Sequence, residues 1–145
     1  MKRVSALKAE ALIEVPFHDV DAMEVAWHGH YIKYFEAARN ALLRAIDYDY
    51  RQMLESGYLW PVVECHAKYI RPARYGQKLE ASAELAEYEN RMKIAYVIQD
   101  AANGEVLTRG HTVQVAVAAA SGELQFVSPQ ALIERVERAA RKAAA

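Results

Sequence analysis

The sequence predicts an α+β fold built from an antiparallel β-sheet and one long helix. Three observations carry this prediction. One stretch of the chain repeats apolar residues at three- and four-residue spacing, as an amphipathic helix does. Later stretches alternate apolar and polar residues, as strands with one buried face do. These strands follow one another without intervening helices, which favours antiparallel pairing over βαβ units.

Length and composition are those of one globular domain. The 145 residues are 53% hydrophobic and 26% charged. A chain of this length can bury a core without disulfides or structural metal. We therefore expect residues 1–145 to form a single domain. The one cysteine, Cys65, excludes an internal disulfide and a multi-cysteine zinc site.

Three further features bear on where the protein works and what it binds. No apolar run approaches the roughly 20 residues of a membrane span, and the first residues lack the apolar stretch of a signal peptide. With a formal net charge of −1, the chain shows no basic excess that would attract nucleic acid. We expect a cytoplasmic protein with no membrane span and no nucleic-acid partner.

The first half of the chain predicts a strand, a loop and the long helix. Residues 11–17 form an apolar-rich run that ends in the polar cluster at residues 18–21, so a strand should lead into a loop. Helical periodicity over residues 30–48 predicts an amphipathic helix of about five turns. Residues 49–57 predict a short helical turn, and Gly57 suits the position just after a helix.

The second half predicts four strands in a meander and a terminal helix. From Trp60 onward the period changes to two, and strands are expected over residues 62–71, 79–85, 92–98 and 107–117. Asn103-Gly104 supplies the positive φ angles of a tight turn between the last two strands. Ser128-Pro129 has the chemistry of a helix start, and the tail to Ala145 predicts a helix that frays at its end.

A single helix can cover only one face of such a sheet. The other face, or a sheet edge, is left for a partner chain. The sequence therefore predicts a homodimer, and it leaves open whether dimers pair into a homotetramer.

The sequence contains no common cofactor or hydrolase signature. Gly-x-Gly-x-x-Gly, the phosphate-binding loop, the Gly-x-Ser-x-Gly elbow and His-Glu-x-x-His are all missing. The side chains of His18, Asp19, Asp21, His28 and His30 contain metal-ligand atoms, but their spacing matches no standard zinc pattern. We therefore expect neither a metal nor an organic cofactor.

The loop that leads into the long helix, residues 17–31, is rich in acids and histidines and contains a glycine. A helix N-terminus offers unpaired N–H groups and a partial positive charge, which can polarise a carbonyl or hold an oxyanion. Gly29 would let a substrate approach this backbone closely. The carboxylate of Asp21 could then act as nucleophile or as general base on water. Residue types alone leave open that Asp19 and Asp21 only form turns.

Two runs of residues resemble a known family. They are Asp19-Val20-Asp21-Ala22 with Val25, His28, Tyr31 and Tyr34-Phe35-Glu36-Ala37-Ala38-Arg39, and the later run Tyr69-Ile70-Arg71-Pro72-Ala73-Arg74. They resemble the 4-hydroxybenzoyl-CoA thioesterase-like branch of the hotdog superfamily, which includes the Tol-Pal-associated acyl-CoA thioesterases. In place of Met23-Glu24, relatives usually carry small residues.

This resemblance implies an architecture and a site. The sheet should wrap around the long helix, two protomers should pair into a continuous sheet, and active sites should lie at the dimer interface. Asp21 should be catalytic, and the backbone N–H near His28 and Gly29 should polarise the thioester carbonyl. The implied reaction is hydrolysis of an acyl thioester, on coenzyme A or an acyl carrier protein, to a free acid and a thiol.

Several roles stay open from the residues. His28 could bond the substrate, orient Asp21 or only cap the loop. Trp27 and Tyr31, like Tyr58 and Trp60, could line an acyl pocket or simply pack. Arg71 and Arg74 could meet the phosphates of coenzyme A, although exposed basic residues usually just face solvent.

Two other functions remain as alternatives. A hotdog dehydratase or hydratase would use Asp21 and His28 to move a proton beside the carbonyl. A non-catalytic acyl-CoA binding protein would retain its ligand and release no thiol.

Overall fold

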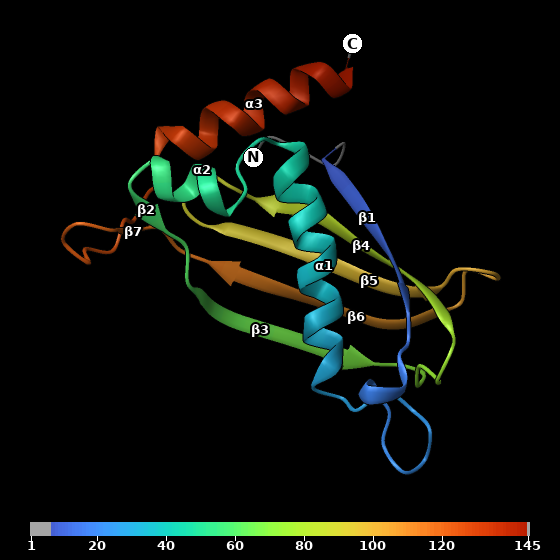
Figure 1. Ribbon diagram of the computed structural model, residues 1–145. Helices are drawn as coiled ribbons and strands as arrows, with labels where there is room; N and C mark the ends of the chain where they lie inside the picture. Colours follow the sequence, from blue (N-terminus) through green and yellow to red (C-terminus); the bar gives the residue numbers. More distant parts are fainter. Residues whose placement is uncertain (1–6, 145) are drawn as a thin grey trace.

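A five-stranded antiparallel sheet curves around one long helix in the computed structural model, which describes residues 7–144 (Figure 1). The strand order is β1-β4-β5-β6-β3. These strands are β1 (Lys8–Glu14), β3 (Val62–Tyr69), β4 (Lys78–Glu87), β5 (Met92–Asp100) and β6 (Val106–Gln114). A second, two-stranded sheet pairs β2 (Tyr58–Leu59) with β7 (Val117–Ala118). The helices are α1 (His30–Ala45), α2 (Tyr50–Glu55) and α3 (Gln130–Ala144), with a 3₁₀ turn at Phe17–Asp19. The predicted α+β class is confirmed.

The apolar face of α1 packs on β1, β4 and β5. Phe35 stacks on Tyr96 of β5, with ring centroids 4.5 Å apart. The helix comes close to the sheet because the facing residues are small: β4 presents Ala81 and Ala83, and a Cβ on Gly110 of β6 would collide with the Phe35 ring. The helix ends at Ala45, earlier than the predicted residue 48.

The strand β3 lies at the sheet edge beside β6, which differs from the predicted four-strand meander. Only β4, β5 and β6 form a meander, while β4 pairs on its other side with β1. Residues 70–77 carry the chain past the start of α1, where Arg74 bridges to Val25 and the N–H of Gly76 donates to the carbonyl of Val15. Alternation assigns residues to sheet faces, but it does not determine which strands are neighbours.

The predicted buried face of β3 is wrong for a single chain. Seven of its eight residues are exposed and the eighth is half-buried. The reason is that α1 packs over β1, β4 and β5, and β3 lies beyond the area that this helix covers.

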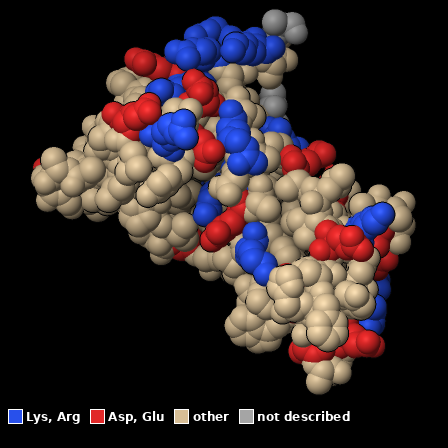
Figure 2. Space-filling view, in the orientation of Figure 1, with Lys and Arg blue, Asp and Glu red and all other residues tan. Residues whose placement is uncertain are grey.

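The C-terminal helix α3 is docked onto the domain, as its buried Leu132 and Val136 show. Arg135 fixes it further, because its Nε donates to the carbonyl of Asp47 at 2.7 Å and its guanidinium lies 5.2 Å from the Tyr48 ring centre. Charged residues cover the outer side of this helix (Figure 2). None of the helices in residues 7–144 is long and apolar enough to cross a membrane.

Candidate active site

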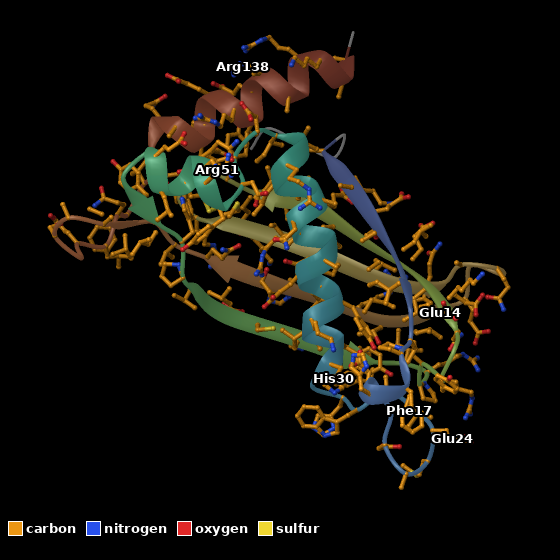
Figure 3. All side chains as sticks on the ribbon, viewed as in Figure 1. Glu14, Phe17, Glu24, His30, Arg51 and Arg138 are labelled. Carbon is orange, nitrogen blue, oxygen red and sulfur yellow. The ribbon has the colours of Figure 1, made fainter. Side chains whose placement is uncertain are left out.

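The segment before α1 folds as a tight hairpin, residues 20–26. A β-bridge joins Val20 to Ala26, and the N–H of Asp21 donates to the carbonyl of Val25 at 3.0 Å. Glu24, at the tip, has a φ of 64° in the left-handed region (Figure 3). The hairpin thus turns sharply at Met23-Glu24 and returns the chain to the start of the helix.

Asp21 lies exposed at the base of this hairpin. One of its carboxylate oxygens accepts the N–H of Met23 at 2.8 Å, and within residues 7–144 this is the only hydrogen bond to the carboxylate. An ionised carboxylate has about four acceptor positions. Asp21 therefore has capacity left for a substrate or a water molecule.

Asp19 is the buried carboxylate of the motif, with only 1% of its surface exposed. It accepts hydrogen bonds from Lys33 Nζ at 2.6 Å and from the Tyr34 hydroxyl at 2.7 Å. Burial alone would raise the pKa of Asp19, but these hydrogen bonds and the Lys33 charge outweigh it, so the pKa lies below its ordinary value. The carbonyl of Asp19 also accepts the N–H of Trp27. Asp19 thereby fastens both arms of the hairpin to α1.

The N-terminus of α1 has no side-chain cap. Gly29 is the N-cap residue, and no described residue accepts a hydrogen bond from the N–H of His28 or Gly29. Such N–H groups, at the positive end of a helix dipole, suit a carbonyl oxygen that gains negative charge. The ring of Trp27 lies where a side chain on Gly29 would project. The absence of a side chain at Gly29 thus leaves room for the half-exposed Trp27 ring. The predicted close approach of a substrate to Gly29 stays a prediction.

Four of the seven predicted site residues line one cavity of about 330 Å³. These are Asp21, His28, Tyr31 and Arg71, joined by Val25, Ala26, Tyr69, Ile70 and Pro72. Trp27, Gly29 and Arg74 do not line it. The Tyr31 hydroxyl accepts the N–H of Ala73 at 2.9 Å, and burial raises the pKa of this tyrosine.

Arg71 also lines a neighbouring cavity of about 540 Å³, and Arg74 lines this second one. The Arg71 guanidinium is not free, because its Nε lies 2.5 Å from Oε1 of Glu105. The two cavities share the lining residues Arg71 and Pro72 and are therefore neighbours.

Tyr69 is a site residue that the sequence reasoning did not select. Its hydroxyl donates to the carbonyl of His28 at 2.6 Å, and its ring meets Tyr31 edge-on at 5.0 Å. It thus ties the end of β3 to the residue before the helix cap. Its position beside Ile70-Arg71-Pro72 in the second motif run is the signal that could have found it.

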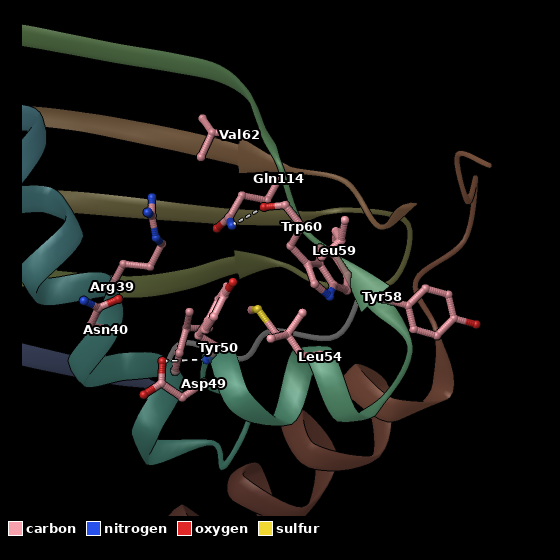
Figure 4. Close-up of a pocket in the computed structure, with 12 residues that line it drawn as sticks. Arg39, Asn40, Asp49, Tyr50, Leu54, Tyr58, Leu59, Trp60, Val62 and Gln114 are labelled. Carbon is pink, nitrogen blue, oxygen red and sulfur yellow. Dashed lines mark hydrogen bonds between the residues drawn. The ribbon is translucent and has the colours of Figure 1, made fainter. Parts of the chain in front are cut away.

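A further cavity of about 230 Å³ lies at the opposite end of β3 (Figure 4). Tyr58 and Trp60 line it, together with residues of α1 and α2. Among residues 7–144, no cluster of three or more His, Cys, Asp or Glu side chains is placed to hold a metal ion.

Comparisons with known proteins agree with this architecture. The chain matches the thioesterase-like superfamily over residues 15–140. It is 29% identical over 128 residues to sll0410 of Synechocystis sp., assigned as an esterase, covering 88% of this chain and 77% of that protein. It is 31% identical over 84 residues to YneP of Bacillus subtilis, assigned as an acyl-CoA thioesterase, covering 58% of this chain and 60% of YneP.

Solved structures share the fold at low identity. The 1,4-dihydroxy-2-naphthoyl-CoA thioesterase Slr0204 from Synechocystis superposes with a TM-score of 0.79 at 18% identity, covering 89% of this chain and 95% of that one. SAV2348 from Staphylococcus aureus, solved in complex with CoA, gives a TM-score of 0.81 at 10% identity, covering 92% and 84%. The predicted hotdog fold is confirmed. By its fold and by the match over residues 15–140, the chain belongs to the thioesterase-like superfamily.

Proposed function

We propose that this protein hydrolyses acyl-CoA thioesters to a carboxylic acid and free coenzyme A, with Asp21 as the catalytic carboxylate. One observation carries the proposal: the carboxylate of Asp21 shares a cavity with His28, beside an uncapped helix N-terminus. Thioesterase relatives support the reaction class. The finer placement in the 4-hydroxybenzoyl-CoA thioesterase-like branch rests on the two sequence runs.

The chemistry divides between the helix and the carboxylate. The backbone N–H groups of His28 and Gly29 hold the thioester oxygen and stabilise the negative charge that forms on it. Asp21 either attacks the carbonyl carbon, giving an anhydride that water cleaves, or removes a proton from an attacking water. In both cases the carbon–sulfur bond breaks and the thiolate leaves to be protonated as coenzyme A.

The second cavity, lined by Arg71 and Arg74, would bind the coenzyme A portion. Guanidinium groups bind phosphate oxygens by paired hydrogen bonds. Arg71 must first exchange its contact with Glu105 for the ligand.

Glu105→Gln should therefore lower KM for an acyl-CoA by up to about fivefold, because exposed ion pairs are worth about 0–1 kcal/mol. Steady-state kinetics at low salt measures this. Glu87→Gln is the matched control, since it removes the ion pair with Arg91 away from these cavities and should leave KM unchanged. An unchanged KM for Glu105→Gln would argue against coenzyme A binding at Arg71.

A panel of saturated acyl-CoA esters, read with a thiol reagent, separates the proposal from its alternatives. A hydrolase releases one thiol for each ester consumed. A dehydratase or hydratase releases none from a saturated ester, and a binding protein retains the ester intact. The absence of thiol release across the panel would end the proposal.

We also propose that two protomers pair through β3. This strand is an edge, it is exposed along its length, and no helix of its own chain covers it. In an antiparallel pair of β3 with its copy, Glu64 can lie opposite Lys68 of the partner. The two-fold symmetry forms this ion pair twice. Exposed apolar residues lie near both ends of the strand: Met23 and Trp27 at one end, Leu59 at the other. The two-fold axis would place Met23 and Trp27 of one protomer near Leu59 of its partner.

Light scattering at micromolar concentration should accordingly give at least twice the 16.3 kDa of one chain. Lys68→Glu places like charges opposite each other at both symmetric positions and should weaken the dimer, whereas Lys78→Glu on β4 should not. A monomer across the micromolar range would contradict pairing through β3.

A further inference from the structure

Two consecutive peptide units at the start of α1 share one hydrogen-bonding pattern. The carbonyl of Trp27 accepts the N–H of His30 at 2.9 Å, and the carbonyl of His28 accepts the Tyr69 hydroxyl at 2.6 Å. The N–H groups on the same two peptides belong to His28 and Gly29, and neither has an acceptor among the described residues. Each peptide therefore has an occupied carbonyl and a free N–H.

A hydrogen bond to a peptide carbonyl strengthens the N–H of the same peptide as a donor. The peptide bond is a resonance hybrid, and its charge-separated form has a negative oxygen and a positive nitrogen. A donor at the oxygen favours that form, and linked hydrogen bonds strengthen one another by about 10–30% per bond. Successive N–H groups in a turn also form a concavity that binds anions. The N–H groups of His28 and Gly29 thus suit an oxygen that gains negative charge.

Tyr69 brings its hydroxyl to this backbone from a different element. It is the last residue of β3, whose end lies beside the start of α1, and it pairs with Thr108 of β6 (Figure 1). Its ring meets the ring of the buried Tyr31 edge-on at 5.0 Å, and the Tyr31 hydroxyl accepts the N–H of Ala73. The sheet and Tyr31 thus fix the hydroxyl of Tyr69, and the hydroxyl in turn fixes the carbonyl of His28.

The Tyr69 hydroxyl is a lasting donor at neutral pH. Burial and the neighbouring Tyr31 raise the pKa of Tyr69 above its ordinary value, which is about 10. The hydroxyl therefore keeps its proton, and that proton is engaged by the carbonyl of His28. Tyr69 is accordingly no source of a proton for the leaving thiolate.

We propose that Tyr69 is a positioning residue for thioester hydrolysis, because it holds the backbone of His28 so that the N–H groups of His28 and Gly29 stabilise the oxyanion. This inference rests on the proposed thioesterase activity, and Tyr69 transfers neither a proton nor an electron pair. The substrate oxygen bears more negative charge in the transition state than in the bound ester. Loss of the Tyr69 hydroxyl should therefore lower kcat and leave KM nearly unchanged.

Steady-state kinetics of Tyr69→Phe tests this split. Removal of a donor that contacts the oxyanion directly costs about 10²–10³-fold in kcat. Because Tyr69 acts through a peptide, kcat should fall less, by about tenfold, with KM within about twofold of wild type. The pH profile of kcat should keep its shape, since Tyr69 does not titrate in the reaction. Tyr50→Phe is the matched control and should match wild type, because Tyr50 is exposed on α2, outside the cavity that contains Asp21.

The carbonyl stretch of the bound ester gives a second readout, which a loss of stability alone would not move. An acyl-CoA labelled with ¹³C at the thioester carbonyl is bound to Asp21→Asn, which should leave the ester intact, and is followed by difference infrared spectroscopy. Hydrogen bonds to a carbonyl lower its stretching frequency, so binding should move the band to lower frequency. Adding Tyr69→Phe should return the band part of the way to that of the free ester, whereas adding Tyr50→Phe should not.

The outcomes separate this inference from the proposed function. Thermal unfolding checks that each variant is folded, and Tyr69→Met is a second variant without the hydroxyl in case Tyr69→Phe fails to fold. An unchanged kcat, an effect on KM alone, a pH profile of altered shape or an unmoved carbonyl band would overturn the role of Tyr69. No thiol release by the wild type, or full activity of Asp21→Asn, would overturn the proposed function instead.

Discussion

Asp21→Asn is expected to lower the turnover of an acyl-CoA by at least about a hundredfold. General acid–base groups contribute typically 10²–10⁴-fold, and loss of a nucleophile costs more. The substitution keeps the volume of the side chain and retains an oxygen that can accept the N–H of Met23. Because Asp21 is exposed, the free energy of unfolding should change little. Thiol release and thermal unfolding, measured on the same preparation, check both parts.

Glu24→Gln is a suitable control for this experiment. It removes a carboxylate from the tip of the same hairpin, and Glu24 does not line the cavity that contains Asp21. Its turnover should stay close to wild type. Near-normal turnover of Asp21→Asn, or a loss that coincides with unfolding, would contradict the catalytic role.

The sequence could predict the elements of this fold because each has a regular period. The helix from His30 and the alternation in β4, β5 and β6 were recognisable on those grounds. The order of the strands in the sheet was not recognisable, because it depends on where residues 70–77 lead the chain. The first strand lies at Lys8–Glu14, three residues earlier than predicted, since apolar residues continue through Val15 to Phe17 beyond its end.

The candidate site could be predicted only in part. Asp21, His28, Tyr31 and Arg71 were predicted and share a cavity, whereas Tyr69 stood in the second motif run without a predicted role. That role depends on its contact with His28, 41 residues earlier in the chain. The run marks the residue, but no local pattern encodes the contact.

Asp19 and Asp21 looked equivalent in the sequence and have opposite environments in the structure. An offset of two residues places one carboxylate under α1 and the other in solvent, because the chain between them enters the hairpin. Residue types left open that Asp19 only forms a turn, but in the structure Asp19 also holds the hairpin on α1. Asp19→Asn is consequently unsuitable as a control for Asp21→Asn, because it would weaken the hydrogen bonds that hold the loop on α1.

Asp19→Asn should lower the free energy of unfolding by about 2 kcal/mol. It removes the charge that accepts hydrogen bonds from Lys33 and Tyr34, and bonds to charged groups contribute about 1.5–3 kcal/mol. This loss of stability is smaller than that from breaking a fully buried ion pair, because 51% of the Lys33 side chain is exposed. Urea unfolding at fixed protein concentration measures it. Tyr34→Phe, which removes one of the two bonds and leaves the Lys33 contact, should cost less.

The effect of Asp19 on stability should also depend on pH with a definite sign. The folded-state pKa of Asp19 lies below its unfolded value, which is about 3.9. The folded state therefore favours the ionised form, and the resulting stability is fully present above the unfolded pKa and lost as pH falls through the folded pKa. The difference in unfolding free energy between wild type and Asp19→Asn should be present at pH 5 and shrink below about 4. A difference that does not shrink below about pH 4 would mean that Asp19 is not held as a carboxylate by Lys33 and Tyr34.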